Sequence, residues 1–198
     1  MALEEILLGL LREPASGYDL KRTFDDSVGH FWPASLSQIY PTLKRLEKRG
    51  LLDRRLEPSE RGPERRVYSL TDEGRDALEE WLTSGPELAT ERFGYLAQLF
   101  LMDALGNEEQ TLEFMRDLLD HLSSWRDELE GAQRQVDELG PWIDFPSDHF
   151  HHYASLRMGV LLLGAKVAWC AETIDRLQAR LRARPRAPRD GDSKEGTP

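Results

Sequence analysis

The sequence predicts a mainly α-helical protein in two parts, with one β-hairpin in the first part and long antiparallel helices in the second. Apolar residues recur at helical spacing along most of its 198 residues. Between Leu52 and Leu70 the pattern changes to an alternation of period two, which the turn-rich segment PSERGPE interrupts. Two heptad stripes joined by a short linker follow, and they are typical of helices that pack along their length.

Three helices are expected before the hairpin. Apolar residues at helical spacing predict the first over residues 2–12 and the second over residues 16–27, with a serine as its cap. The third is expected over residues 35–49, because Gly50 follows as a helix-terminating residue and basic residues fill the last turn. Pro41 has no backbone N–H and is therefore expected in the first turn of this helix.

The hairpin leads into a fourth helix, from Thr71 to Trp81, and Ser84-Gly85-Pro86 is the best boundary after it. Three helices, a hairpin and a further helix follow one another in a winged helix-turn-helix, in which the hairpin is the wing. We therefore expect a first domain of this type over residues 1–83.

The second domain is expected to be all-α and to cover residues 84–183. Its first helix, over residues 91–105, is strongly apolar, and Asn107 is expected to cap the next helix. Residues 184–198 are rich in Pro, Arg, Gly and Asp and are expected to form a disordered tail. The first heptad stripe comprises Met115, Leu118, Leu122, Trp125, Leu129, Ala132, Val136 and Leu139. The second comprises Tyr153, Leu156, Val160, Leu163, Val167, Cys170, Ile174, Leu177 and Leu181.

The net charge of −10 conceals an uneven distribution of charge. Residues 41–66 hold nine basic and five acidic side chains, whereas residues 76–182 hold nine basic and 20 acidic ones. Local charge decides which polyanion can approach a surface, so the acidic total does not exclude binding of nucleic acid by the first domain.

Several other classes of protein find no support in the sequence. A single cysteine, Cys170, excludes an intramolecular disulfide and a multi-cysteine metal site. The N-terminal segment MALEEILLGLLRE has glutamates where a secretory signal has lysines, and uninterrupted apolar runs such as Val160–Leu163 are far too short to span a membrane. We expect a cytoplasmic protein with no membrane contact and no cofactor. No phosphate-binding loop or nucleophile–base pair is recognisable, so we expect no enzymatic activity.

The third helix has the division of faces that a DNA-recognition helix requires. Wound at about 100° per residue, its apolar residues fall on one side, and its amide, hydroxyl and cationic side chains fall on the other. Cations neutralise phosphates, and Gln or Arg can form bidentate hydrogen bonds with base edges in the major groove. The apolar side comprises Leu36, Ile39, Leu43 and Leu46. The residues expected to contact DNA are Ser37, Gln38, Tyr40, Pro41, Thr42, Lys44, Arg45 and Lys48 on this helix, and Arg61, Arg65 and Arg66 in the hairpin.

These residues are expected to divide into base readers and phosphate contacts. Gln38 lies near the start of the helix, where recognition helices reach base edges, so it is the expected base reader. The lysines and arginines further along the helix and on the wing are expected to contact phosphates.

Two segments, QIYPTLKRLEKRGLLDRR and RGPERRVYSLTDEGRDALEEWL, closely resemble the PadR family of bacterial transcriptional regulators. The resemblance covers residues 3–83, and the second half looks like the AphA-like C-terminal domain of the larger PadR subfamily. Glu64 departs from the family, whose wing tip is usually more basic. The resemblance implies a homodimer, held by its C-terminal helices, that reads an inverted repeat on double-stranded DNA. Many members are repressors released by a small aromatic or drug-like ligand.

Two further groups of residues suggest ligand sites. The surplus of aromatic residues around Trp32, Trp81 and Trp142 indicates a site for a small aromatic effector between the two domains. The histidines of the segment DHFHH suggest a metal site and, with it, a metal-dependent enzyme, but such sites need three or four convergent ligands. Exposed loop histidines are the simpler interpretation of His149, His151 and His152.

A third alternative is a winged-helix module that binds proteins and has lost DNA binding. The acidic net charge favours it, and the local excess of basic residues opposes it. Affinity for duplex DNA that falls steeply with salt would separate the two.

Overall fold

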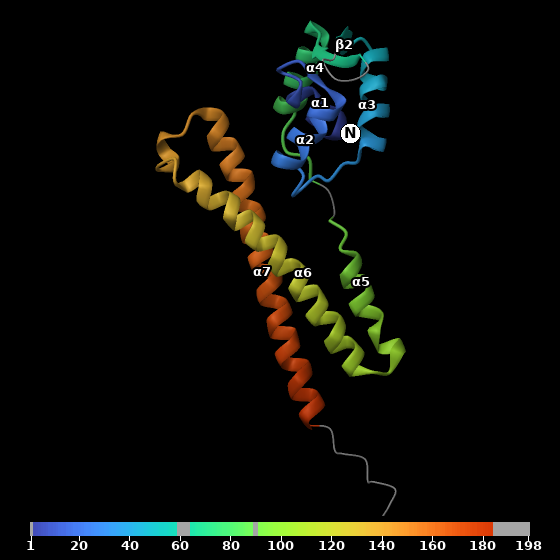
Figure 1. Ribbon diagram of the computed structural model, residues 1–198. Helices are drawn as coiled ribbons and strands as arrows, with labels where there is room; N and C mark the ends of the chain where they lie inside the picture. The colour runs from blue at the N-terminus through green and yellow to red at the C-terminus, as the bar shows by residue number, and fades with distance from the viewer. Residues whose placement is uncertain (1, 59–63, 89–90, 184–198) are drawn as a thin grey trace, which may run out of the picture. The chain divides into compact units, whose positions relative to one another are not determined.

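The computed structural model describes residues 2–58, 64–88 and 91–183 (Figure 1). The chain divides into two compact units, Met1–Thr90 and Glu91–Pro198, so the division falls a few residues after the predicted boundary. The predicted DNA contact Arg61 and the predicted tail lie outside the described residues.

The N-terminal unit contains the four predicted helices. The second, third and fourth predicted helices start within a residue or two of the observed ones, because Ser16, Ser35 and Thr71 precede these starts. Ser16 forms a capping box with Asp19, and the hydroxyl of Thr71 accepts a hydrogen bond from the N–H of Gly74 at 3.0 Å. The helices are α1 (Ala2–Leu10), α2 (Gly17–Ser27), α3 (Leu36–Lys48) and α4 (Asp72–Thr83).

The predicted hairpin is part of a three-stranded antiparallel sheet with the order β1-β3-β2. Strand β2 (Leu52–Glu57) pairs with β3 (Arg65–Leu70), as the alternation predicts. Strand β1 (Ala15–Ser16) pairs with the opposite edge of β3 and was not predicted, since two residues cannot show an alternation.

One core joins the helices and the sheet of the N-terminal unit. Helix α4 packs so closely that a Cβ atom on Gly74 would lie 2.1 Å from the carbonyl oxygen of Leu51. Leu36 differs from its predicted place on the apolar side, because at the start of α3 it is 38% exposed. The fully buried apolar side chains are Leu7, Leu8, Leu11, Leu20, Phe24, Ile39, Leu43 and Leu46.

Pro41 is also displaced from its predicted position. Helix α3 begins at Leu36, so the proline lies in the second turn and not in the first. Its missing N–H leaves the carbonyl of Ser37 without the usual donor four residues on.

The C-terminal unit is all-helical, as predicted, and its long helices α6 and α7 run antiparallel side by side (Figure 1). The side chain of Asn107 caps α6 by accepting from the N–H groups of Glu109 and Gln110 at 3.0 and 3.3 Å. The predicted helix over residues 91–105 starts later and tightens into a 3-10 turn. The elements are α5 (Gly94–Leu101), η1 (Met102–Leu105), α6 (Glu108–Asp137), η2 (Trp142–Asp144) and α7 (Ser147–Ala183).

The two heptad stripes are only partly buried. Met115, Leu122, Leu163, Cys170 and Ile174 form the centre of the contact between α6 and α7. Trp125 and Leu139 also belong to the first stripe, but they are 43% and 67% exposed. A regular heptad therefore predicted where the two helices meet, but it did not predict how far along them the contact extends.

Helix α7 is long and apolar enough to cross a membrane, by length and composition only. The sequence prediction missed this property, because small and polar residues interrupt every apolar run in the helix. Val160 and Leu163 are buried, and the helix packs against α6; core helices pass the same test.

Candidate nucleic-acid interface

Helix α3 presents a row of polar and cationic side chains away from the core. Ser37, Lys44 and Lys48 fall within about 40° of one another on the helix, and all three are exposed. The two lysines form no ion pair with any part of the chain that the structure describes. Tyr40 lies at the edge of this row and is 42% exposed. We call Ser37, Lys44 and Lys48 the open face.

Gln38 lies about 100° round the helix from the open face and is engaged at the start of α3. Its side-chain oxygen accepts hydrogen bonds from the backbone N–H of Ser35 at 3.0 Å and from the hydroxyl of Ser35 at 3.1 Å. The predicted base reader thus serves as a helix cap in this structure, and its base contact remains a prediction.

Thr42 was expected to contact DNA, but the structure places it in the interior. It is 4% exposed, and its hydroxyl accepts a hydrogen bond from Arg45 at 3.3 Å. Its position about 140° from the centre of the open face turns it toward the core, so it has to be removed from the set of DNA contacts.

Arg45 and its neighbour Arg49 are held by one carboxylate of α1. The Nε of Arg45 donates to Glu4 Oε1, and Nη1 of Arg49 donates to Glu4 Oε2, both at 2.5 Å. Burial alone would raise the pKa of Glu4, but the hydrogen bonds and charges of the two arginines outweigh it and lower that pKa. Glu4 is therefore ionised at neutral pH and neutralises part of the charge of α3.

A similar ion pair fixes the base of the wing. Arg65 on β3 donates to the carboxylate of Asp19 on α2, and the hydroxyl of Ser16 donates to the same carboxylate oxygen at 2.7 Å. The hydrogen bond from Ser16 and the charge of Arg65 keep the pKa of Asp19 low, although burial opposes them. Arg66 beside it is exposed and has no ion pair with the described residues.

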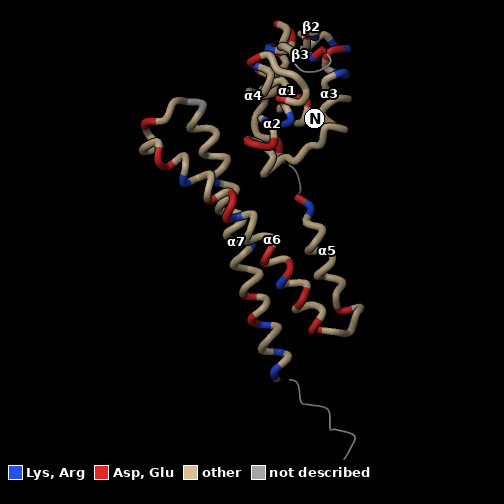
Figure 2. The backbone as a smooth tube through the Cα atoms, in the orientation of Figure 1, with Lys and Arg blue, Asp and Glu red and all other residues tan. Residues whose placement is uncertain are grey.

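A groove of about 670 Å³ separates α3 from the wing. Tyr40 and Glu64 line it from these two sides, with Gly17 between them. A Cβ atom on Gly17 would lie 2.5 Å from the Tyr40 ring, so only glycine lets the ring lie there. Figure 2 shows basic positions on α3 and on both hairpin strands, with acidic positions among them.

The three tryptophans predicted to line an effector site are not brought together within one unit. Trp32 and Trp81 belong to the N-terminal unit and Trp142 to the C-terminal unit. Trp32 and Trp142 are 40% and 56% exposed. The indole N–H of Trp81 donates to Glu87 at 3.0 Å, and Trp142 lies against Phe150. The shared site therefore remains a prediction.

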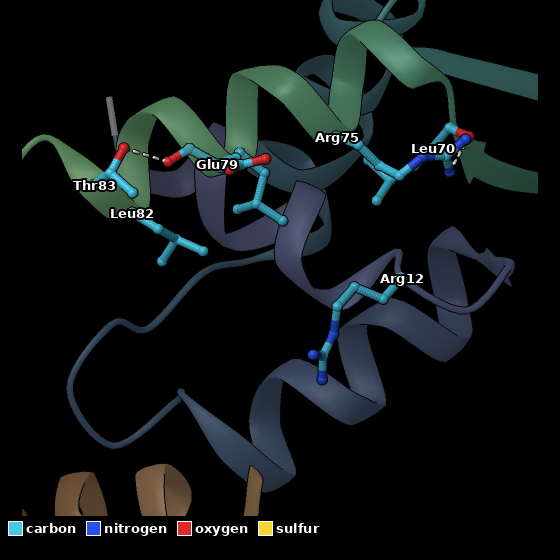
Figure 3. A pocket seen from close by; sticks show the side chains of 7 residues that line it. Arg12, Leu70, Arg75, Glu79, Leu82 and Thr83 are labelled. Carbon is cyan, nitrogen blue, oxygen red and sulfur yellow. Dashed lines mark hydrogen bonds between the residues drawn. The ribbon is translucent and has the colours of Figure 1, made fainter. Parts of the chain in front are cut away.

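A small apolar pocket lies in the N-terminal unit, between α4 and the end of α1 (Figure 3). Its volume is about 490 Å³, and Leu70, Leu78 and Leu82 form its apolar lining. Arg12 lies across from α4 and forms no ion pair with the described residues. Sequence reasoning missed this pocket, because its residues come from three separate segments.

The histidines at the start of α7 lie on the helix and not in a loop, and all three are exposed. Among the described residues, no group of three His, Cys, Asp or Glu side chains could hold a metal ion.

A helix-turn-helix with an open cationic face, beside a β-hairpin wing, defines a DNA-binding regulator of the winged-helix class. Residues 6–80 match the family described as "Transcriptional regulator PadR-like family", and residues 92–178 match "Virulence activator alpha C-term". The chain is 30% identical over 171 residues to the negative transcriptional regulator PadR of Bacillus subtilis, which covers 84% of this chain and 92% of that protein. The chain therefore belongs to the PadR-like family of transcriptional regulators. The predicted family is confirmed, and since its relatives are regulators, the chain is not an enzyme.

Solved structures confirm the predicted fold class. B. subtilis PadR in complex with operator DNA has a TM-score of 0.77 at 27% identity, over 89% of this chain and 99% of that one. The same protein in complex with p-coumaric acid has a TM-score of 0.68 at 27% identity, over 89% and 95% of the two chains. The Vibrio cholerae virulence activator AphA has a TM-score of 0.71 at 24% identity, over 90% and 99%, and shares the fold.

Proposed function

We propose that this regulator is a cytoplasmic, ligand-responsive repressor that binds an inverted-repeat operator as a homodimer. The observation that carries the proposal is the open face of α3, where Lys44 and Lys48 have no partner among the described residues. Exposed cations on a recognition helix neutralise phosphates, and the wing beside it adds Arg66. A relative with the same fold has been solved on its operator DNA.

The C-terminal unit supports the homodimer. Phe100, Leu101 and Leu105 are 83%, 61% and 57% exposed, although they lie on or beside an otherwise apolar helix. Exposed apolar clusters of this kind mark surfaces that another protein covers. A second copy of the chain is the proposed cover, since two recognition helices related by two-fold symmetry would read the two halves of an inverted repeat.

The proposed ligand response is based on a relative, B. subtilis PadR, whose structure has been solved in complex with p-coumaric acid. A planar aromatic acid is small enough for the pocket on α4, where leucines would face the ring and Arg12 the carboxylate. Trp81 lies on the same helix, so its fluorescence would report binding there. Titration of the full chain with p-coumaric acid tests this, with Arg12→Gln as the variant expected to bind it more weakly.

Selection of bound fragments from random duplex DNA tests the proposal as a whole. A recovered inverted repeat would support a dimer that reads sequence, and its spacing would give the separation of the two recognition helices. Affinity that falls steeply with salt is expected for DNA binding. Salt-independent affinity, or no enrichment of any fragment, would instead favour the winged-helix module that binds proteins.

A further inference from the structure

Four cations, three in the second half of α3 and one at its C-cap, Arg49, form two pairs that point in different directions. At about 100° per residue, Lys44 and Lys48 are about 40° apart, as are Arg45 and Arg49, and the two pairs are about 100° apart. The lysines project from the open face. The arginines project from the flank of the helix, on the side of α1, where they meet the Glu4 carboxylate.

The flank of a recognition helix faces a phosphate strand. A helix with its side chains is about 10–12 Å across, and the major groove is about 12 Å wide, so both flanks lie close to the sugar–phosphate backbone. Unpaired arginines on this flank would bind phosphates of any sequence, because phosphate contacts carry no sequence information.

Glu4 is placed to compete with those phosphates. Its side chain is only 10% exposed, whereas those of Arg45 and Arg49 are 45% and 53% exposed, so the arginines reach inward from the surface to a fixed carboxylate. Each guanidinium donates to a different oxygen of that carboxylate. A phosphate that recruits either arginine has to displace an ion pair that is already formed.

The base of the wing has the same arrangement. Arg65 donates to Asp19, whose carboxylate is also fixed by the hydroxyl of Ser16. Carboxylates from α1 and α2 therefore form ion pairs with cations of α3 and of the wing, the two elements proposed to contact DNA. Lys44, Lys48 and Arg66 have no ion pair with the described residues.

We infer that Glu4 is a specificity-determining positioning residue that acts through Arg45 and Arg49. It holds both arginines away from phosphate and so limits binding to DNA of arbitrary sequence, while Lys44 and Lys48 remain available. The inference rests on the proposed binding of DNA by α3. It explains why the recognition helix combines four cations with a buried carboxylate that neutralises part of their charge.

The test compares the full-length Glu4→Gln variant with the native chain on duplex DNA of scrambled sequence. Release of one or two arginines should steepen the dependence of log affinity on log salt by about one to two units per half-site. Between 50 and 200 mM salt, the variant should lose about threefold to twelvefold more affinity per half-site than the native chain does. The preference for operator over scrambled DNA should fall. Asp72→Asn is the matched control, because it makes the same change in charge and releases Arg75 on α4.

Combination with Arg45→Gln separates release of the arginine from a change in structure. Arg45→Gln alone should leave the salt dependence nearly unchanged, but in the Glu4→Gln background it should remove about one unit of the gain. An equal effect of Arg45→Gln in both backgrounds, or an unchanged salt dependence in Glu4→Gln, would overturn the inference. If Glu4→Gln does not fold, as judged by circular dichroism, the single Arg45→Gln variant is the test. A salt dependence that this variant lowers by about one unit would overturn the inference.

Lys48→Ala distinguishes failure of this inference from failure of the proposed function. It should lower the salt dependence by about one unit per half-site. If it does so while Glu4→Gln has no effect, only the role of Glu4 is wrong. If Lys48→Ala also has no effect, α3 does not contact DNA, and the proposed function fails with the inference.

Discussion

The two units of the chain bury their apolar residues to very different degrees. In the N-terminal unit eight large side chains on α1, α2 and α3, or directly after α1, are fully buried around one core. In the C-terminal unit α6 and α7 bury a narrow seam, and of the residues described there only Met115 and Cys170 reach the same degree of burial. Helix α5 buries no residue at all, although almost all of it is apolar.

This contrast indicates which unit can stand alone. A unit with a closed core needs no further surface, whereas a unit with exposed apolar helices is stable in water only when another surface covers them. The N-terminal unit therefore has the features of an independent binding module, and the C-terminal unit has those of an assembly domain. Substitutions in either unit can therefore test that contrast.

The largest effect is expected from Leu43→Asp, which places an unpaired charge at a fully buried position of α3. Burial of a charge without a partner should cost more than about 4 kcal/mol and unfold the N-terminal unit. Hydrogen exchange of the full chain should show loss of protection in α1 to α4 and retained protection in α6 and α7. Leu43→Met, which conserves volume, should cost less than about 1.5 kcal/mol. Loss of protection in both units together would contradict their independence.

The next effect is expected from Phe100→Asp, at an 83% exposed position of α5. A charge in a surface covered by a second copy should shift the chain from dimer to monomer in sedimentation equilibrium. Operator affinity should fall by a factor on the order of 10² to 10⁴, because the two half-sites are then no longer bound by linked modules. Gln98→Asp, an exposed position of the same helix, is the control and should remain dimeric. A dimeric Phe100→Asp variant would mean that α5 is not the covered surface.

A smaller effect on DNA affinity is expected when a single exposed cation is removed from the N-terminal unit, and none when one is removed from the C-terminal unit. Lys48→Ala should weaken binding to operator and scrambled DNA alike. For each phosphate that is no longer neutralised, the affinity of the variant should fall about threefold to fourfold less between 50 and 200 mM salt than that of the native chain. Arg116→Ala, on an exposed position of α6, should change neither affinity nor its salt dependence. Equal effects of the two variants would show that net charge, and not the open face, controls binding.

The smallest effect is expected from acid. The carboxyl pKa values of Glu4 and Asp19 are lowered, and both residues lie in the N-terminal unit. A lowered pKa adds stability above the ordinary carboxyl pKa of about 4, and this stability is lost as the pH falls through the folded-state value. Urea unfolding between pH 6 and pH 3 should therefore show a decline in stability in the N-terminal unit that Glu4→Gln reduces. A decline of equal slope in Glu4→Gln would mean that other groups are responsible.

The elements of the fold were predictable where one residue type carries the local signal. Ser16, Thr71 and Asn107 mark the starts of their helices because their side chains replace the missing backbone acceptors. The strand β1 was not predictable, since it exists only through pairing with β3 from a distant part of the chain. The exposure of Trp125 was missed for a related reason, because a heptad does not say where its partner helix ends.

The sequence predicted which face of the third helix is exposed, but not which ion pairs its side chains form. Helical spacing placed Lys44 and Lys48 correctly on the exposed side. It could not show that Arg45 is bound by Glu4, which lies 41 residues earlier in the chain, because such a contact depends on how α1 packs against α3. The capping role of Gln38 was missed for a local reason, since a glutamine three residues after a serine fits a capping box as well as a base contact, which stays a prediction.

The short strand β1 and the charged strand β2 also affect how the protein behaves at high concentration. The unpaired edge of a sheet can recruit strands from other molecules and begin aggregation. At one edge of this sheet the outer strand has only two residues, which is too short to recruit another strand. At the other edge, β2 exposes the charged side chains of Asp53, Arg54 and Arg55, and charged side chains on an edge strand disfavour its pairing with another chain. The wing can therefore remain extended and accessible without making the protein prone to self-association through its strands.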